Sequence, residues 1–210
     1  MSKIEKKLDS RSEVMRVILN VSKSLAKEQQ GALFIIADPE KIEGYYRPHY
    51  PQIQFSGNIL TKGMDMVVEK LATLDGAVIF TPDGLLVAYG SRILKSEEIL
   101  GFGTKHAAAR GITLFDDTFT AVLVSEETGW IKVFQKGEIV LETDSVDIEP
   151  STLEKVSRFL TNQDMALLAS AGIAAAAVGA PAVLIVGGAY MVVRTAGSMI
   201  SSALKKDKYR

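Results

Sequence analysis

Between residues 32 and 142 the chain alternates short apolar runs with turn-forming residues, and this pattern limits the fold more than any other feature of the sequence. Runs of this kind, rich in Val, Ile and Phe and bounded by Gly, Pro or polar residues, predict β-strands. The predicted strands are 32–36, 77–80, 85–89, 119–124, 131–134 and 139–141. This part of the chain must therefore build a sheet.

Turns and helices between the predicted strands indicate how that sheet is arranged. Thr81-Pro82-Asp83-Gly84 places a proline and a glycine where a tight turn needs them, so the flanking strands should be antiparallel. Apolar residues at helical spacing predict one helix around residues 14–25, another at 61–73 and a third at 104–111. We therefore predict an α/β fold with a mixed, largely antiparallel central sheet flanked by helices.

Composition excludes several classes of function. The 210 residues carry a formal net charge of −1, which argues against a general nucleic-acid-binding protein. The chain contains no cysteine, so disulfides, thiolate metal sites and a thiol nucleophile are excluded. We expect no nucleic-acid partner, and the charged N-terminal stretch lacks the apolar core of a secretory signal, which predicts a cytoplasmic domain.

The chain changes character after residue 142. Residues 143–162 predict a polar linker followed by a short amphipathic helix at 151–160, which sets residues 1–142 apart as one domain. Residues 165–193 include no charged side chain and are rich in Ala and Gly, and basic residues follow them. We therefore expect an apolar helical segment over 163–210 that attaches the protein to the membrane, as a single span or a re-entrant hairpin. The alternative is a soluble cytoplasmic protein in which this segment is a helical hairpin packed against a partner.

Three polar stretches lie at the ends of predicted strands or helices, where a site can be exposed without disturbing the core. In Asp75-Gly76-Ala77, a carboxylate that can bind a cation or accept a proton precedes two minimal residues that leave the backbone accessible. In Gly101-Phe102-Gly103-Thr104-Lys105-His106, glycines before a helix are followed by a hydroxyl group and a cation, a pattern typical of phosphate binding. Arg110 should share a helix face with His106, and Ser125-Glu126-Glu127-Thr128-Gly129 closes the strand at 119–124. Each stretch alone is also compatible with an ordinary turn or helix end.

Taken together and in this order, the stretches resemble the diadenylate cyclase domain family. This nucleotide-binding module is found at the N-terminus of the DNA integrity scanning protein and in membrane-attached cyclic di-AMP synthases. The resemblance covers residues 17–140 and includes the strand Gly31-Ala32-Leu33-Phe34-Ile35-Ile36 besides the three stretches above.

The resemblance implies an activity and a set of site residues. Two ATP molecules would condense to cyclic di-AMP and two pyrophosphates with Mg²⁺ or Mn²⁺, in an active site completed by a face-to-face homodimer or a higher homo-oligomer. The implied catalytic residues are Asp75, Lys105 and His106. Nucleotide binding would involve Gly76, Ala77, Gly103, Thr104, Lys105, Arg110 and Ser125, and the metal would be held by Asp75, Glu126 and Glu127.

One departure from the family pattern concerns the cations of the predicted helix. The usual Arg-His-Arg is here Lys105-His106-Ala107, so one bidentate guanidinium becomes a point charge and the second cation is lost. Arg110 is a candidate to replace it. The alternative function is a sensor or scaffold that binds ATP or cyclic di-AMP but has lost catalysis. The aromatic segment 45–51 predicts an ordered loop that can line an adenine pocket.

Overall fold

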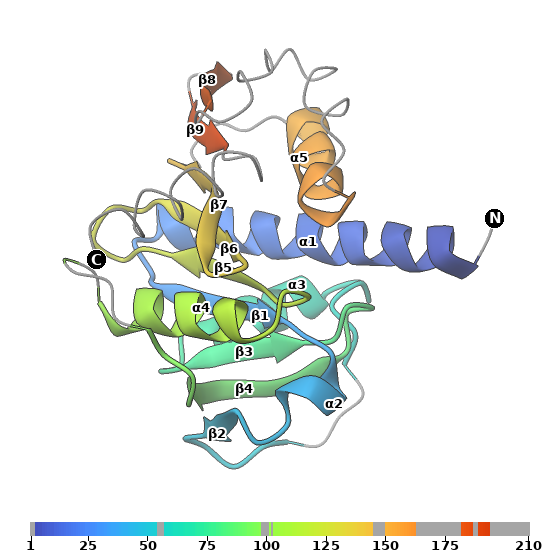
Figure 1. Cartoon of the computed structure of the whole chain (residues 1–210), viewed down its shortest axis with the longest axis vertical. Coiled ribbons are helices and arrows are strands. Elements are labelled where there is room, and N and C mark those ends of the chain that lie inside the picture. Colours follow the sequence, from blue (N-terminus) through green and yellow to red (C-terminus); the bar gives the residue numbers. More distant parts are fainter. Residues whose placement is uncertain are drawn as a thin grey trace, which may run out of the picture.

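The computed structural model describes residues 3–53, 57–97, 101, 103–144, 150–162, 182–186 and 189–193 (Figure 1). The helices are α1 (Lys3–Lys27), α2 (Pro39–Ile42), α3 (Met64–Ala72), α4 (Thr104–Phe115) and α5 (Pro150–Asn162). The strands are β1 (Ala32–Ile36), β2 (Tyr46–Pro48), β3 (Ala77–Phe80), β4 (Leu86–Ile93), β5 (Thr120–Val124), β6 (Ile131–Gln135), β7 (Glu138–Thr143), β8 (Ala182–Val186) and β9 (Ala189–Val193).

The described strands form one sheet with the order β2-β4-β3-β1-β5-β6-β7-β9-β8. Only the pair β1–β3 is parallel among them, so the sheet is mixed and largely antiparallel, as the sequence predicts. All residues of β1 and β3 are buried, in keeping with continuous apolar runs that are covered on both faces.

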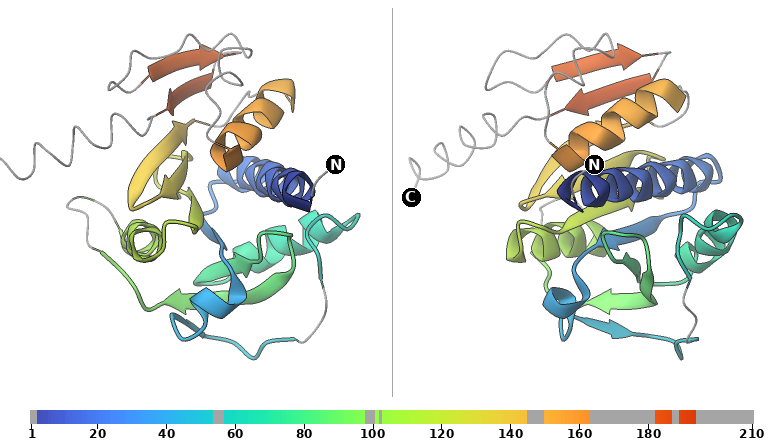
Figure 2. Two further views of the ribbon diagram at one scale, coloured as in Figure 1. Left: turned by 45° about the vertical axis from the view of Figure 1, so that its right-hand side comes forward. Right: turned by 90° about the vertical axis from the view of Figure 1, so that its right-hand side faces the viewer.

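Helices cover both faces of this sheet. In Figure 2, α4 lies on one side of the sheet and α1 on the other. On the α1 side, a core built from alternate strand residues such as Phe34 and Val78 also contains apolar residues of α1, α3 and α5. On the α4 side, Leu33, Ile35 and Ala77 pack with Ala109 and Ile112 of α4. The expected helices flanking a central sheet are therefore confirmed.

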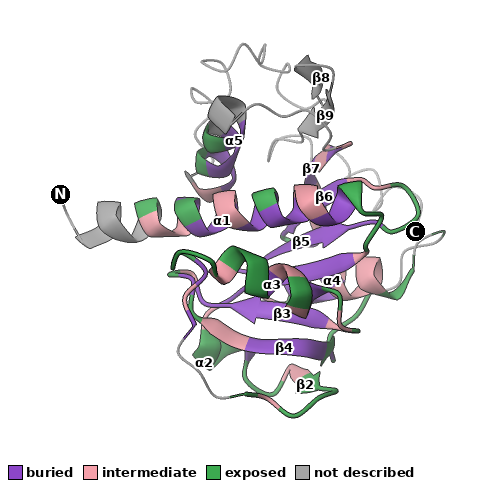
Figure 3. Ribbon diagram, turned by 180° about the vertical axis from the view of Figure 1, so that it is seen from behind, coloured by how far each residue is buried: buried purple, intermediate pink, exposed green. Residues whose placement is uncertain are grey.

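The helix α1 shows how the sequence pattern produces this packing. Val14, Ile18, Val21 and Leu25 recur at helical spacing, and all four side chains are buried against the sheet. Figure 3 shows the buried stripe of α1 facing the strands, whereas much of α3 is exposed on its outer side.

The turn between β3 and β4 forms as its sequence predicts. The amide of Gly84 donates to the carbonyl oxygen of Thr81 at 3.0 Å, and the Thr81 hydroxyl accepts a hydrogen bond from the amide of Leu85 at 2.9 Å. Gly84 has a φ of +93°, the conformation for which glycine is favoured at this position.

The short strand β2 was not predicted. It lies in the aromatic segment 45–51, which we expected to be a loop, and it pairs with β4 alone at the edge of the sheet. Pro48 lowers the strand signal of the sequence because proline cannot donate to the ladder, yet an edge strand tolerates it.

The helical expectation for the apolar segment is wrong over residues 182–186 and 189–193, which are the strands β8 and β9. These strands pair with each other, and β9 pairs with β7. The sequence holds two runs enriched in Val, Ile and other strand-forming residues, separated by Gly187 and Gly188, and this pattern is typical of a β-hairpin rather than of a long helix. The length of an apolar run alone does not distinguish a β-hairpin from a long helix.

The rest of the segment, 163–181, 187–188 and 194–210, lies outside the described residues. Within the described part of the chain, none of the helices combines the length and the apolar character that crossing a membrane requires. Attachment to a membrane stays a prediction.

The helix α5 confirms the short amphipathic helix expected near residues 151–160, and its apolar face joins the core of the domain. Leu153, Val156, Phe159 and Leu160 are buried in the same cluster as the apolar residues of α1. The sequence before α5 is polar, but α5 itself packs into the core of the domain.

This packing predicts that α5 contributes to the stability of the domain. Phe159→Ala should lower the free energy of unfolding by about 3 kcal/mol, because it removes a buried ring and leaves a cavity between α5 and its neighbours. Chemical denaturation of the full chain measures the effect.

The neighbouring Arg158 provides the control. Its guanidinium pairs with Glu154 at 3.1 Å on the solvent side of α5. Arg158→Ala should change the stability by less than about 0.5 kcal/mol, because exposed ion pairs contribute little. Equal effects of the two substitutions would contradict the burial of α5.

Candidate active site

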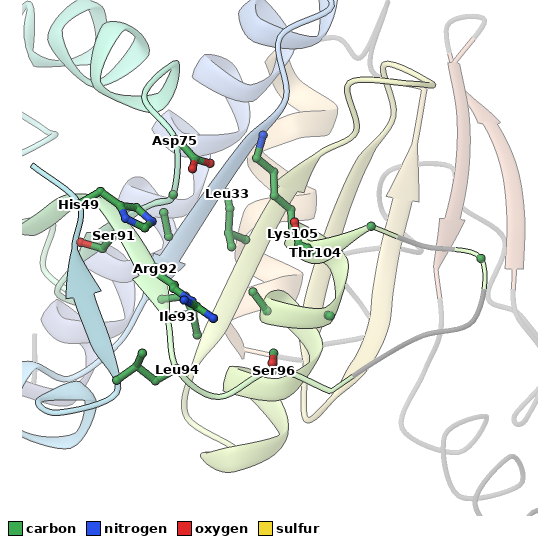
Figure 4. A pocket seen from close by; sticks show the side chains of 16 residues that line it. Leu33, His49, Asp75, Ser91, Arg92, Ile93, Leu94, Ser96, Thr104 and Lys105 are labelled. Atoms are coloured by element: carbon green, nitrogen blue, oxygen red, sulfur yellow. The ribbon is translucent and has the colours of Figure 1, made fainter.

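A cavity of about 950 Å³ lies between the strands β3 and β4 and the N-terminal part of α4 (Figure 4). Its volume is in the range of small-molecule sites. The lining residues come from five segments of the chain: Leu33, His49, Asp75, Gly76, Ala77, Ser91, Arg92, Ile93, Leu94, Ser96, Gly101, Gly103, Thr104, Lys105, Ala107 and Ala108. The first two of the three polar stretches therefore meet in one cavity.

Gly76 allows β3 to approach β4 closely at the start of this cavity. Its φ is +108°, and an added Cβ atom would lie 2.5 Å from the backbone nitrogen of Ser91, so only glycine fits. Asp75 precedes it with an exposed side chain at the cavity, and Ala77 follows it in the buried strand. The sequence thus places a carboxylate beside accessible backbone, as expected.

The N-terminus of α4 faces the cavity without a cap. The N-cap residue is Gly103, which has no side chain to accept hydrogen bonds from the first turn, and that turn contains no acidic residue. The carbonyl oxygen of Gly103 accepts hydrogen bonds from the amides of His106 and Ala107 at 3.1 Å and 3.2 Å. The amides of Thr104 and Lys105 precede the first intrahelical donors, so this end of the helix favours an anion.

Lys105 links the cavity to the third polar stretch. Its Nζ atom donates to the carbonyl oxygen of Gly31 at 3.3 Å. A Cβ atom added at Gly31 would lie 3.1 Å from this Nζ atom and 3.2 Å from Oε2 of Glu126, so both charged groups reach the same point before β1. The carboxylate of Glu126 therefore belongs to the surroundings of Lys105, although it does not line the cavity.

The other members of the third stretch are not brought to the cavity. Ser125 is buried, and its amide donates to the carbonyl oxygen of Trp130 at 2.9 Å in the turn after β5. Glu127 is exposed in the same turn.

His106 and Arg110 lie on a different face of α4 from the cavity lining. The ring of His106 stands edge-on to that of Phe134 in β6, with 6.3 Å between the centroids. Arg110 is half-buried one turn later, and its Nε atom makes no hydrogen bond in the described part of the chain. The structure therefore does not bring Arg110 to the place where Ala107 lines the cavity.

The surroundings of His106 keep its imidazole neutral. Burial is the largest cause that lowers its pKa to about 4, and the positive charge of Lys132 lowers it further, whereas Glu142 acts in the opposite direction. Lys132 and Glu142 face each other across β6 and β7 and form an ion pair at 3.1 Å. At pH 7 His106 therefore carries no charge that could hold a phosphate. Lys105 is the charged residue of Lys105-His106-Ala107.

Sequence reasoning missed part of the wall contributed by β2 and β4. His49 follows β2 and was anticipated only as part of an aromatic segment able to line a pocket. Ser91 to Ile93 of β4 and the following Leu94 carry no motif, and the predicted strand ended before them. Only the pairing of β4 with β3 and β2 places them at the site.

The described residues hold no group of three or more His, Cys, Asp or Glu that could bind a metal ion on its own. Asp75 offers one carboxylate in the cavity. Mg²⁺ is commonly bound by one or two carboxylates together with substrate phosphates, so this donor set fits a cation that arrives with a nucleotide.

The sequence profile of the family described as DisA bacterial checkpoint controller nucleotide-binding, abbreviated DAC, matches residues 20–139. The chain belongs to the DAC family. The match includes the cavity and all three polar stretches, whereas α5, β8 and β9 lie beyond it.

Curated relatives of this DAC domain are named diadenylate cyclase. The protein of Methanocaldococcus jannaschii is 27% identical over 146 residues, which are 67% of this chain and 47% of the relative. The protein of Haloferax volcanii is 29% identical over 142 residues, which are 62% of this chain and 52% of the relative. The chain thus spans about half the length of these relatives. A crystal structure of DacA from Staphylococcus aureus, a double mutant, is 26% identical with a TM-score of 0.47, over 74% of this chain and 95% of that one.

The environment of His106 predicts an acidic titration. In an NMR titration its imidazole should have a midpoint near pH 4. The imidazole of an unfolded histidine has a pKa of about 6.5. Between pH 4 and this value the unfolded chain binds more protons than the folded chain, so the free energy of unfolding should fall as the pH decreases through this range. His106→Gln should reduce this pH dependence. A midpoint near 6.5 would contradict the proposed surroundings of the ring.

Proposed function

We propose that this protein condenses two molecules of ATP into cyclic di-AMP with release of two pyrophosphates. One observation carries the proposal: Asp75, the uncapped N-terminus of α4 and Lys105 are gathered around a single cavity of nucleotide size in a DAC domain. The names of the relatives agree with this activity.

In the proposed reaction, the 3′-oxygen of one ATP attacks the α-phosphorus of the other. The new O3′–P bond forms as the bond from the α-phosphorus to the bridging oxygen breaks, and pyrophosphate leaves with the electron pair. The 3′-hydroxyl proton passes to Asp75. The same exchange in the opposite direction closes the ring and releases the second pyrophosphate.

The chain's own groups supply positioning and charge, which are the main needs of such a transfer. Asp75 orients the attacking hydroxyl and accepts its proton. Gly76 and Ala77 leave room for the nucleotide against the backbone. The first amides of α4, the Thr104 hydroxyl and the Lys105 ammonium group bind phosphate oxygens.

Mg²⁺ or Mn²⁺, held by Asp75 and the phosphates, would neutralise charge on the triphosphate. Glu126 and Glu127 are candidates for a metal only if the turn after β5 approaches a nucleotide from outside the cavity, because neither lines it.

The reaction also requires a second chain. The described part of one chain has one cavity joined to the N-terminus of α4, whereas the product contains two adenosine units. Two domains that face each other would bring the 3′-hydroxyl of one bound ATP to the α-phosphate of the other. We therefore propose a face-to-face homodimer, or a higher homo-oligomer that contains such pairs.

A second candidate is a protein that binds ATP or cyclic di-AMP without turnover. It is favoured by one observation, the lack of a second charge where α4 lines the cavity: Ala107 contributes a methyl group there, and His106 is neutral at pH 7. The two candidates differ in product formation and agree in nucleotide binding.

Substitution of Asp75 tests the proposed enzyme. Asp75→Asn should lower the formation of cyclic di-AMP from ATP and Mn²⁺ by about a hundredfold or more, because the amide cannot accept the proton. The exposed side chain makes no hydrogen bond to the rest of the described chain, so the melting temperature should stay unchanged. Mass spectrometry of the reaction mixture measures the product.

Asp117→Asn is the matched control, because Asp117 is exposed in the loop between α4 and β5, away from the cavity. It should leave synthesis unchanged. Undiminished synthesis by Asp75→Asn would overturn the role of Asp75. A wild-type chain that binds nucleotide but makes no product would favour the second candidate.

A further inference from the structure

Two arginines oppose each other at the edge of the sheet beside the cavity. The antiparallel register of β2 and β4 pairs Arg47 with Arg92. Side chains of directly opposed residues project from the same face of a sheet, and like charges in such a pair are destabilising. Both arginines are exposed. A sheet edge with this pairing is a place where an anion would relieve the repulsion.

Arg92 is also part of the cavity wall. Figure 4 shows its side chain in the group that lines the cavity, well separated from the Nζ atom of Lys105 in that view. Within the described chain, neither Arg92 nor Arg47 makes a side-chain hydrogen bond or an ion pair. The Nζ atom of Lys105, in contrast, is bound to the carbonyl oxygen of Gly31. Arg92 is therefore a cation of the cavity whose hydrogen-bonding groups are available to a ligand.

We infer that Arg92, assisted by Arg47, forms a second anion-binding subsite of the cavity, which binds part of the polyphosphate chain of a nucleotide. The inference rests on the proposed function and extends it by a residue pair outside the polar stretches of the sequence. A guanidinium group binds two phosphate oxygens at once, which a lysine cannot do. Arg92 lies on β4, the wall of the same cavity to which Ala107 of α4 contributes no charge.

Binding measurements on the full chain separate this role from contact with the base. The ligands are 3′-deoxy-ATP, which lacks the attacking hydroxyl and cannot condense, 3′-deoxyadenosine and inorganic tripolyphosphate. Arg92→Gln should weaken the binding of 3′-deoxy-ATP and of tripolyphosphate by at least about tenfold and leave that of 3′-deoxyadenosine within about twofold, because charge-assisted hydrogen bonds to phosphate are lost. Arg92→Lys should fall between wild type and Arg92→Gln.

Two further variants complete the set. Arg47→Gln should weaken the same two ligands to a smaller extent. Lys62→Gln removes an exposed cation near α3, outside this cavity, and should leave all three affinities unchanged. Without ligand, Arg92→Gln should melt at the same temperature as the wild type or higher, since it removes one of two opposed charges.

Several results would overturn the inference. An equal loss for 3′-deoxy-ATP and 3′-deoxyadenosine would assign Arg92 to the base, beside the apolar Ile93 and Leu94 of the same wall. Undiminished binding of tripolyphosphate by Arg92→Gln would show that no anion is held there, and a lower melting temperature of the ligand-free variant would contradict the repulsion between the two arginines.

Product formation and nucleotide binding together distinguish failure of the proposed function from failure of the proposed subsite. If the wild type makes no cyclic di-AMP but its binding of 3′-deoxy-ATP depends on Arg92, the cyclase activity is overturned and the subsite stands. If the wild type makes cyclic di-AMP while Arg92→Gln binds 3′-deoxy-ATP and tripolyphosphate as the wild type does, only the subsite is overturned.

Discussion

The close contact between the backbones of β3 and β4 at Gly76 determines where the site lies. Because residue 76 has no Cβ atom and a positive φ, Asp75 can stand at the start of β3 while Ser91 passes directly beside it. The same contact brings the last residues of β4 into the cavity wall, which His49, directly after β2, completes. A larger residue at this position would push the two strands apart and separate the carboxylate from that wall.

One face of the helix α4 lines the cavity, and another packs against the sheet. Gly103, Thr104, Lys105 and Ala107 face the cavity, where the uncapped amides favour an anion. His106, between them in sequence, instead faces Phe134 of β6 and is half-buried, within the electrostatic influence of Lys132 and Glu142. Thr104, Lys105 and His106 are consecutive in the sequence, and all three were predicted to lie at the phosphates. The structure places Thr104 and Lys105 at the cavity and His106 in the contact between helix and sheet, because successive positions on a helix point about 100° apart.

The sequence predicted what depends on local patterns. The strands of the central sheet, the turn at Thr81-Pro82-Asp83-Gly84 and the polar residues before β3 and α4 all follow from short-range spacing. It did not predict Arg92, because an arginine in a strand becomes a site residue only through its cross-strand partners. It also mistook β8 and β9 for helix, since an apolar run rich in alanine and glycine looks alike in both structures until the strand-forming residues on either side of Gly187 and Gly188 are weighed.

The central claim is that the cavity between β3, β4 and α4 holds the nucleotide. Hydrogen–deuterium exchange of the full chain, with and without saturating 3′-deoxy-ATP, tests it directly. Bound 3′-deoxy-ATP should slow exchange in residues 75–77, 91–94 and 103–107, and leave exchange unchanged in the groove of about 500 Å³ between α1 and α3, near residues 59–66. Protection confined to that groove, or no protection in the three cavity segments, would contradict the account.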